Sequence, residues 1–508
     1  MTHDLRNLGP SASDRAAGVL LAQACGDALG APYEFGPALP DNVPVSMKGG
    51  GPFGWAPAEW TDDTSMSIPL LEAGEHALHR RDTLLDHLDH VAVAWHRWAQ
   101  QSKDVGAQTR AVLSDAASHG PLTAEALATA ARDHHDRVGR SGGNGSLMRT
   151  APIALACLHD EERLAVTSRR VSELTHVDPD AGDACVLWCA AIRHAVLTGR
   201  LDVRIGLTLL PHVRRALWED RLTEAENRPP SYFDRNGWAV QALQAAWSAI
   251  SRTPVPTDAP ERGTYPAQHL RLALETAVRA GHDTDTVAAI AGALLGARWG
   301  ASAVPACWRR RVHGWPAISS SELAARGLAL ASGLSDQSSW PLGNRLDYAG
   351  YGAIGLLVEH PHDPGVLLGD VAVLDDLPAQ VDAVVSLCRV GRRQPSEVAA
   401  GNRVQVWLID SADPAANPHL DFVLADAADA VAALRAEGRT VLLHCVAAQS
   451  RTPTVAAVYA VRHFGINPQS ALDQVGAALP FSHPNPAFRS AVLRLATPPG
   501  SRIEGETP

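Results

Sequence analysis

The sequence predicts a multidomain chain in which an all-α domain is followed by an α/β domain. Three observations support this prediction. Apolar residues recur at spacings of three and four through most of residues 14–330, which is the period of amphipathic helices. After about residue 360, short runs rich in β-branched residues alternate with helical stretches, as expected for a largely parallel sheet. The 508 residues are also enough for two domains with separate cores.

The helical pattern of the first part is clearest in five segments, at 16–29, 84–100, 183–199, 238–250 and 286–300. Runs that alternate β-branched and polar residues are almost absent there. Proline-rich pieces at 226–237 and 252–266 interrupt the periodic segments, so we predict loops at both places.

The second part contains three candidate strands, at 382–388, 404–410 and 440–445, and a helical stretch at 420–438. The sequence EHPHDPG at 359–365 combines two prolines with a glycine, which favours a boundary between domains. We therefore predict an all-α domain over 14–358 and an α/β domain over 365–497.

Composition excludes several classes of protein. The net charge of −11 is spread along the chain, so no surface for nucleic acid is predicted. The seven cysteines show no repeated CxxC spacing, which disfavours a disulfide framework or a thiolate zinc site. The first residues lack a signal-peptide pattern and no apolar run reaches 18 residues, so we expect a soluble, cytoplasmic protein without a membrane partner.

The stretch VLLHCVAAQSRTPT at 441–454 places a cysteine between an apolar run and a helical pattern. A strand that ends at Cys445 and a helix that begins near Arg451 direct backbone N–H groups inward, which suits a phosphate group. The helix start and the Arg451 guanidinium favour the thiolate form of the cysteine, and Arg451 can hold two phosphate oxygens at once. Thr452 can donate its hydroxyl to the departing sulfur. The alternative is a structural cysteine at the end of a core strand.

On this loop, residues 365–500 resemble the dual-specificity and tyrosine phosphatases, whose loop reads His-Cys, five residues, Arg, then Ser or Thr. The resemblance implies a phosphocysteine intermediate and a general-acid aspartate after an earlier strand. Asp410 matches that position and Asp413 is the reserve candidate. The family usually has glycine where this chain has Ala448. If that position needs positive φ, alanine costs about 1 kcal/mol, which puts the activity and substrate range in question.

Two clusters of aspartate and threonine, WTDDTSM at 60–66 and GHDTDTV at 281–287, have the same content although more than two hundred residues separate them. Each precedes a helical pattern, so one interpretation is helix capping. The other starts from charge, because the adjacent carboxylates repel each other. Two clusters brought together hold four negative charges, which two divalent cations balance, and oxygen ligands select Mg²⁺ or Mn²⁺.

Further stretches, GDALGAPYEF at 26–35, GNGSLMR at 143–149 and THVDP at 175–179, occur with the two clusters in a fixed order. In this order they resemble the ADP-ribosylglycohydrolases, including the dinitrogenase-reductase-activating type, over about residues 14–330. The resemblance implies an all-α fold and a site for two Mg²⁺ or Mn²⁺ ions. The implied metal ligands are Thr61, Asp62, Asp63, Asp283, Asp285 and Thr286. The other implied site residues are the acidic residue Glu34 and the substrate contacts Asn144, Gly145, Ser146 and His176.

The chemistry implied by this resemblance is hydrolysis of an α-glycosidic bond between ADP-ribose and an acceptor. Cations that hold the vicinal ribose hydroxyls would orient the anomeric carbon toward water. Glu34 is the first candidate for acid or base, followed by Asp62 or Asp285. The sequence leaves the acceptor open among arginine, serine, an acetyl ester, a nucleobase and a phosphate. The partners expected are therefore an ADP-ribosylated protein or small molecule and a phosphorylated substrate.

Two other interpretations use the same motifs. In one, the second domain is a phosphate-binding module without catalysis, which Ala448 favours and the set of Cys445, Asp410 and Arg451 opposes. In the other, the first domain is a non-catalytic ADP-ribose reader that holds metal for structure alone.

Overall fold

The computed structural model describes residues 8–495, and the chain divides into two compact units. The first, called the helical unit here, comprises residues 8–254 together with His269–Val304 and Arg311–Ser335. The second, called the sheet unit, comprises Val255–Gln268, Pro305–Arg310 and residues 336–495. Residues 496 and 497, at the end of the predicted α/β domain, lie outside the described residues.

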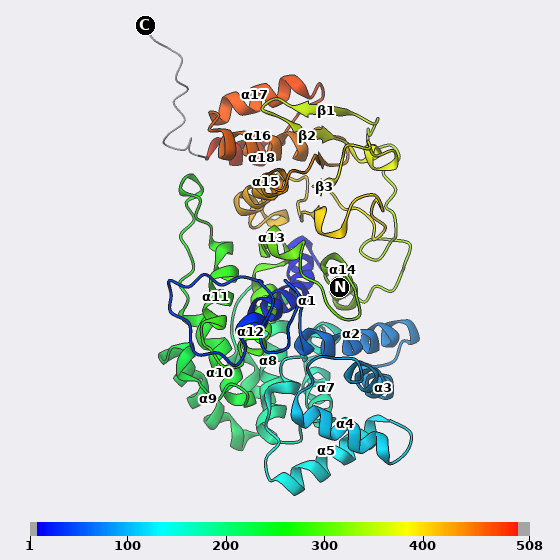
Figure 1. The fold of residues 1–508 in the computed structure, drawn as a ribbon, viewed down its shortest axis with the longest axis vertical. Coiled ribbons are helices and arrows are strands. Elements are labelled where there is room, and N and C mark those ends of the chain that lie inside the picture. The colour runs from blue at the N-terminus through cyan, green and yellow to red at the C-terminus, as the bar shows by residue number, and fades with distance from the viewer. Residues whose placement is uncertain (1–7, 496–508) are drawn as a thin grey trace, which may run out of the picture. The chain divides into compact units, whose positions relative to one another are not determined.

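The helical unit consists of helices joined by turns and short 3-10 segments (Figure 1). Its helices are α1 (Pro10–Gly30), α2 (Asp62–Arg80), α3 (Leu88–Ala99), α4 (Ala107–Ser118), α5 (Ala124–Val138), α6 (Ala151–Ala156), α7 (Glu161–Glu173), α8 (Pro179–Thr198), α9 (His212–Asn227), α10 (Ala239–Arg252), α11 (His269–Val278), α12 (Thr284–Trp299) and α14 (Ser320–Ser332). Within residues 8–335, β pairing is limited to isolated bridges. The all-helical architecture predicted for this part is confirmed.

Helices α1 and α12 run side by side through the core of this unit (Figure 1). Their contact is made of small residues. A Cβ atom added to Gly296 would lie 2.1 Å from the Gly18 carbonyl oxygen, and one added to Gly30 would lie 2.4 Å from Asp285 Cα. Glycine therefore lets the two backbones approach at van der Waals distance. This close packing brings the last turn of α1 to the first turn of α12.

The sheet unit contains five strands in the order β1-β2-β5-β3-β4. The strands are β1 (Leu357–His360), β2 (Asp363–Gly369), β3 (Ala383–Ser386), β4 (Arg403–Gln405) and β5 (Val441–His444). The β1–β2 pair is antiparallel, whereas β2–β5, β5–β3 and β3–β4 are parallel. The helices of this unit are α13 (Ala306–Arg309), α15 (Leu420–Ala436), α16 (Arg451–Phe464), α17 (Pro468–Ala478) and α18 (Pro486–Leu493). The predicted α/β character is confirmed as a small mixed sheet.

The central strand β5 is buried along its whole length, and its Leu443 belongs to the same core as Val385 of β3 and Val431 of α15. A strand buried on both faces needs continuous apolar residues, which is the pattern VLL shows before His444. The core therefore anchors the end of β5, where the cysteine loop begins.

The segment 359–365, predicted as a boundary, forms the turn of the β1–β2 hairpin. His360 is buried and its ring bonds the Ala456 carbonyl at 3.1 Å, while Asp363 accepts hydrogen bonds from Arg435 and Tyr459. Side-chain bonds thus hold this proline-containing turn within the sheet unit. The domain limits 14–358 and 365–497 stay predictions about independent folding. Among residues 8–495, no helix has the length and apolar character needed to cross a membrane.

Candidate functional site

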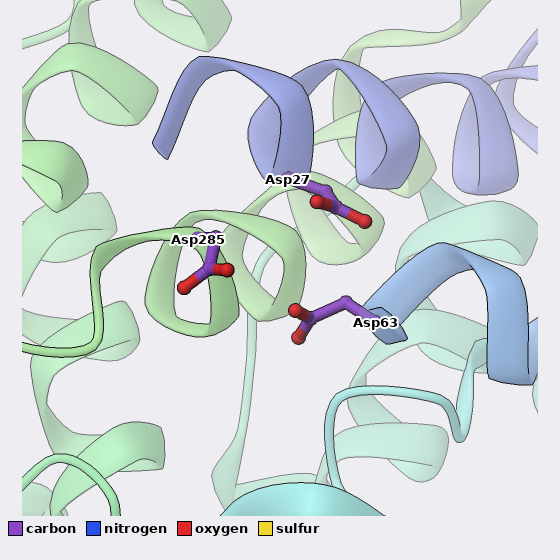
Figure 2. Close-up of side chains that lie close together, drawn as sticks. All are labelled: Asp27, Asp63 and Asp285. Carbon is purple, nitrogen blue, oxygen red and sulfur yellow. The ribbon is translucent and has the colours of Figure 1, made fainter. Parts of the chain in front are cut away.

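Three carboxylates from three helices meet in the interior of the helical unit (Figure 2). Asp27 lies near the end of α1, Asp63 in the first turn of α2 and Asp285 in the first turn of α12. One oxygen atom from each lies within 4.8 Å of the others, and all three residues are buried. The two aspartate clusters of the sequence are therefore brought together, as the charge argument required, and a residue from α1 joins them.

A second group of carboxylates adjoins the first and shares Asp285 with it. Glu34, Asp283 and Asp285 also have one oxygen each within 4.8 Å of one another. Two backbone bonds explain the position of Glu34. Phe35 N donates to the His282 carbonyl at 2.6 Å, and His282 N donates to the Gly36 carbonyl at 2.7 Å. This short pairing joins the segment after α1 to the loop that begins α12.

Asp27 is a member of the site that the sequence analysis did not single out. Its carboxylate accepts hydrogen bonds from Thr61 N at 2.8 Å, Thr64 N at 2.9 Å and Thr64 Oγ1 at 2.6 Å. It thereby satisfies free N–H groups at the start of α2 and orients the first aspartate cluster. The sequence did contain one indication of its role, because Asp27 is an acidic residue inside the otherwise apolar run 16–29.

The residues of the first aspartate cluster, 61–63, do not all face the groups of carboxylates. Thr61 Oγ1 donates to Asp63 Oδ2 at 3.0 Å, while Asp63 Oδ1 is buried without a hydrogen-bond partner. Asp62 is half-buried and belongs to neither group of three. Asp63 is thus the residue of this cluster that faces the other carboxylates.

The second cluster is held by its own helix and by the glycine-rich turn. Thr286 N donates to Asp285 Oδ1 at 2.9 Å, within the first turn of α12. Asn144 Nδ2 donates to Asp283 Oδ2 at 2.8 Å and to the Asn236 carbonyl at 2.8 Å. Asn144, expected to contact substrate, therefore also fixes the orientation of a candidate ligand.

Burial and mutual repulsion raise the pKa values of these carboxyl groups. Burial, followed by Asp283 and Asp104, raises the pKa of Glu34 to about 9. Burial also raises the pKa of Asp27 to about 6, against the hydrogen bonds from Thr64 and Thr61. The pKa values of Asp63 and Asp285 lie well above the usual range for the same two reasons, burial first and neighbouring carboxylates second.

Asp104 is a second residue of this acidic region that the sequence analysis missed. It lies between α3 and α4, and burial together with Asp283 raises its pKa to about 6. It is also the largest electrostatic cause of the raised pKa of Asp62, after burial. No motif marks Asp104 in the sequence, so only the fold shows that it belongs to the acidic region.

The residues present fit divalent cations. The donor set consists of carboxylate oxygens, and two of these, Asp63 Oδ1 and Glu34 Oε2, are buried without hydrogen-bond partners. An unpaired buried carboxylate oxygen is costly, and a hard cation is the partner that oxygen-only ligands select. A positive charge here would also lower the raised pKa values.

The glycine-rich turn Asn144–Ser146 lies against His176. A Cβ atom added to Gly145 would lie 3.1 Å from His176 Cε1. Ser146 is buried, and its hydroxyl is hydrogen-bonded to Ser172 Oγ at 3.0 Å. Gly145 and His176 are therefore adjacent, while the Ser146 side chain is hydrogen-bonded within the fold.

The cysteine loop of the sheet unit connects β5 to α16. Cys445 follows the last residue of β5 and is 2% exposed, and Arg451 is the first residue of α16. Ala448 has φ 54°, so the position at which the phosphatase resemblance expects glycine does adopt the left-handed region. The loop keeps this backbone shape despite the alanine side chain.

Arg451 lies beside Asp410, the first candidate for the general acid. Arg451 Nε is buried without a hydrogen-bond partner and lies 3.8 Å from Asp410 Oδ2. Asp410 Oδ1 accepts hydrogen bonds from Ser450 Oγ at 2.7 Å and Asn485 Nδ2 at 2.9 Å. Asp413, the reserve candidate, caps a short turn through Ala415 N. The structure thus brings Asp410 to the loop from a segment thirty-five residues away.

Two further residues support the loop from the core. Thr452 is fully buried, and its hydroxyl donates to the Gly369 carbonyl at 3.4 Å. The His444 ring bonds Ser386 Oγ at 2.7 Å, and burial lowers the pKa of His444 to about 4. A neutral, hydrogen-bonded His444 therefore links β5 to β3 directly before the cysteine.

The helical architecture and the carboxylate groups define a class of protein. One family model, that of the ADP-ribosylglycohydrolases, matches residues 8–338. The chain belongs to this family.

Two relatives are similar to the chain over about 300 residues each. The chain is 30% identical to the ADP-ribosylarginine hydrolase Tri1 of Pseudomonas putida over 311 residues, which cover 59% of this chain and 75% of that protein. It is 28% identical to the ADP-ribosyl-[dinitrogen reductase] glycohydrolase of Rhodospirillum rubrum over 306 residues, which cover 59% of this chain and 90% of the relative.

A shorter stretch is similar to a different protein. Over 151 residues the chain is 32% identical to the dual specificity phosphatase 28 of Homo sapiens, and the match covers 28% of this chain and 82% of that protein.

Proposed function

We propose that the helical unit hydrolyses the α-glycosidic bond between ADP-ribose and an acceptor, with two divalent cations, Mg²⁺ or Mn²⁺, held by its carboxylates. The observation that carries the proposal is the pair of carboxylate groups that share Asp285. Asp27, Asp63 and Asp285 would hold one cation, and Glu34, Asp283 and Asp285 would hold a second. Family membership supports the same activity.

The cations, when bound, supply positive charge that fixes the ribose hydroxyls and polarises the reacting groups. The chain's own residues do the rest. Asp283 and Asp285 present oxygens from the start of α12, where Asn144 fixes Asp283. Glu34 is the residue proposed to exchange a proton with the leaving group or with water, because its Oε2 has no partner in the fold and lies beside both aspartates.

An ADP-ribosylated arginine side chain is the proposed first substrate, because the relative in Pseudomonas putida carries the name ADP-ribosylarginine hydrolase. The test is to incubate the protein with compounds in which ADP-ribose is attached to arginine, serine, an acetyl ester or a phosphate. Released ADP-ribose is measured with Mg²⁺, with Mn²⁺ and with a chelator. We expect release from at least one compound, lost in the chelator and in Asp283→Asn. Binding of every compound without release would support a non-catalytic reader instead.

We propose a second activity, a cysteine-dependent phosphatase, for the sheet unit. The observation that favours it is the buried Arg451 Nε without a hydrogen-bond partner, at a loop that begins with Cys445 and lies beside Asp410. A guanidinium in this position can hold phosphate oxygens. The similarity to dual specificity phosphatase 28 supports the same assignment.

In this reaction the Cys445 sulfur forms a bond to phosphorus while the ester oxygen leaves and takes a proton from Asp410. Water then attacks phosphorus, returns a proton to Asp410 and releases inorganic phosphate and the free sulfur. Hydrolysis of an aryl phosphate should therefore disappear in Cys445→Ser while ADP-ribose release is unchanged. If phosphate binds with no ester hydrolysed, the unit is a phosphate-binding module.

We also propose that the protein is located in the cytoplasm.

A further inference from the structure

Arg149 is a buried arginine of the helical unit that the proposed reaction does not use. It is fully buried, and its guanidinium lies 3.8 Å above the centre of the Trp95 ring. Among the described residues it forms no ion pair with a carboxylate, although Asp62 is close enough to affect its pKa, and its Nε atom has no hydrogen-bond partner. A buried cation without an ion pair is costly, so its remaining contacts need an explanation.

The polar contact of Arg149 with an oxygen atom is to Thr175. Arg149 Nη2 donates to Thr175 Oγ1 at 2.6 Å. The direction of this bond is certain, because a guanidinium group has five donors and no acceptor. The Thr175 hydroxyl therefore accepts one hydrogen bond, and its own hydrogen must go to another atom.

That other atom is on His176. Thr175 Oγ1 and His176 Nδ1 are 2.7 Å apart, and Thr175 is fully buried. No further acceptor for this hydroxyl occurs within residues 8–495. If His176 Nδ1 carried the hydrogen, the hydroxyl hydrogen would be buried without an acceptor, at a cost of about 1–3 kcal/mol. The satisfied arrangement has Thr175 donating to Nδ1.

An Nδ1 atom that accepts leaves the single hydrogen of a neutral imidazole on Nε2. Burial lowers the pKa of His176 to about 3, which keeps the ring neutral. His176 Nε2 lies 3.2 Å from the position of a Cβ on Gly143 and 3.3 Å from one on Gly145. Nε2 has no hydrogen-bond partner in the described part of the chain, although the residue is 2% exposed. A donor is thus left unpaired at the glycine-rich turn.

We infer that Arg149, acting through Thr175, holds His176 as the neutral tautomer with its hydrogen on Nε2, so that His176 donates to an oxygen atom of the substrate at the turn Gly143–Gly145. Arg149 and Thr175 are positioning residues in this arrangement. The identity of the substrate oxygen as part of ADP-ribose rests on the proposed function, whereas the tautomer does not.

We call the chain of hydrogen bonds from Arg149 through Thr175 to His176 the relay. The backbone at Thr175 and His176 is held by hydrogen bonds that do not involve the Arg149 guanidinium or the Thr175 hydroxyl. His176 N donates to the Ser172 carbonyl at 2.8 Å, and Ser172 Oγ donates to the His176 carbonyl at 3.2 Å. Gln108 Nε2 donates to the Thr175 carbonyl at 2.7 Å. Loss of the Thr175 hydroxyl should therefore change the protonation pattern of the ring more than its place.

The decisive experiment is NMR of the full chain with ring-¹⁵N histidine, in which the His176 signals are those lost in His176→Asn. Ring nitrogen shifts distinguish the two neutral tautomers. The wild type and Thr175→Ser, which keeps the hydroxyl, should show hydrogen on Nε2. Thr175→Val, which has the same shape without the hydroxyl, should show a mixture. Hydrogen on Nδ1 in the wild type, or identical spectra for all three proteins, would overturn the inference.

Kinetics with the ADP-ribosylated substrate provide a second readout. Because one hydrogen bond to the substrate is weakened, KM should rise about five- to tenfold in Thr175→Val, with a smaller change in kcat. Thr150→Val is the matched control, because it removes another buried hydroxyl, which lies 3.1 Å from Cys189 Sγ. An equal rise of KM in both variants would argue against the relay. If no compound is hydrolysed, the proposed function fails, while the nitrogen shifts still decide the tautomer.

Discussion

Gly30 and Asp285 touch at the backbone. A Cβ atom on Gly30 would lie 2.4 Å from Asp285 Cα, and Thr284 Oγ1 donates to the Gly30 carbonyl at 2.9 Å. The end of α1 and the start of α12 are thus joined where two groups of carboxylates share one residue. The position of the candidate metal ligands depends on the absence of a side chain at Gly30.

We predict that Gly30→Ala separates these two turns and weakens divalent-cation binding. The Gly30 backbone is helical, with φ −78°, so the cost comes from the contact with α12. We expect a loss of about 1–3 kcal/mol in the free energy of unfolding and a clear fall in Mn²⁺ affinity, measured by calorimetry. Gly9→Ala is the control, because a Cβ there meets no atom within 4 Å. Equal affinities in both variants would contradict the prediction.

Asn144 should matter for the cations although it is not a ligand. Its amide donates to Asp283 Oδ2, and loss of such an orienting bond typically lowers metal affinity about 10- to 100-fold. Asn144→Ala should show this loss in a Mn²⁺ titration, with ADP-ribose release restored by excess metal. Asn227→Ala removes an exposed amide that bonds the Thr223 carbonyl, and it should leave affinity unchanged.

Asp14 should make the stability of the helical unit depend on pH. Burial raises the pKa of Asp14 to about 6, although Ser302 donates to both of its oxygens. Because the pKa in the folded state exceeds the value near 3.9 of an unfolded chain, the folded state binds more protons between these values. Stability should therefore fall by about 3 kcal/mol as pH rises from about 4 to about 7.

The measurement for Asp14 is urea unfolding at several pH values, compared with Asp14→Asn. The variant keeps the shape of the side chain but cannot ionise. The fall in the free energy of unfolding that Asp14 causes between pH 4 and 6 should therefore be absent in the variant. Parallel curves for the two proteins would show that Asp14 does not titrate in this range.

Ala448 should carry backbone strain. Its φ of 54° costs alanine about 1 kcal/mol, whereas glycine adopts the same conformation without this cost. We therefore expect Ala448→Gly to stabilise the sheet unit slightly and to keep or raise the hydrolysis of an aryl phosphate. Ala447→Gly is the matched control, since Ala447 is not among the residues with positive φ, and it should destabilise the unit. A fall in stability with Ala448→Gly would show that the methyl group packs favourably in the loop.

The place at which the chain is cut should decide whether the sheet unit stays folded. A cleavage sequence inserted at 359–365 opens the β1–β2 hairpin and separates Asp363 from Arg435 and Tyr459. A sequence inserted at 334–338 precedes these bonds. We expect phosphatase activity to survive cleavage at the second place and to be lost at the first. Survival after both cuts would support the boundary predicted at 359–365.

The sequence alone determined the type and place of the main elements. The three-and-four spacing of apolar residues predicted helices at 183–199 and 286–300, where α8 and α12 occur. The predicted strands at 382–388 and 440–445 contain β3 and β5. Local periodicity is sufficient for these predictions because each element buries one face or its whole length. The run 404–410 shows the limit, since β4 spans Arg403–Gln405 and only Val404 and Gln405 of the run pair with β3.

For the candidate site too, one part could be predicted from the sequence and the other part only from the tertiary structure. The clusters at 61–63 and 283–286 and the spacing from Cys445 to Arg451 are visible in the sequence because each lies within a few residues. Asp104 was missed because an isolated aspartate carries no pattern, and Asp27 because its one signal, an acidic residue inside an apolar run, was not used. Only the tertiary structure decided that Asp27, Asp63 and Asp285 converge (Figure 2). It also decided that Phe35 pairs with His282 and that Arg149 reaches Thr175. The physical reason is that charge repulsion and hydrogen bonding act through space, and the packing of helices sets those distances.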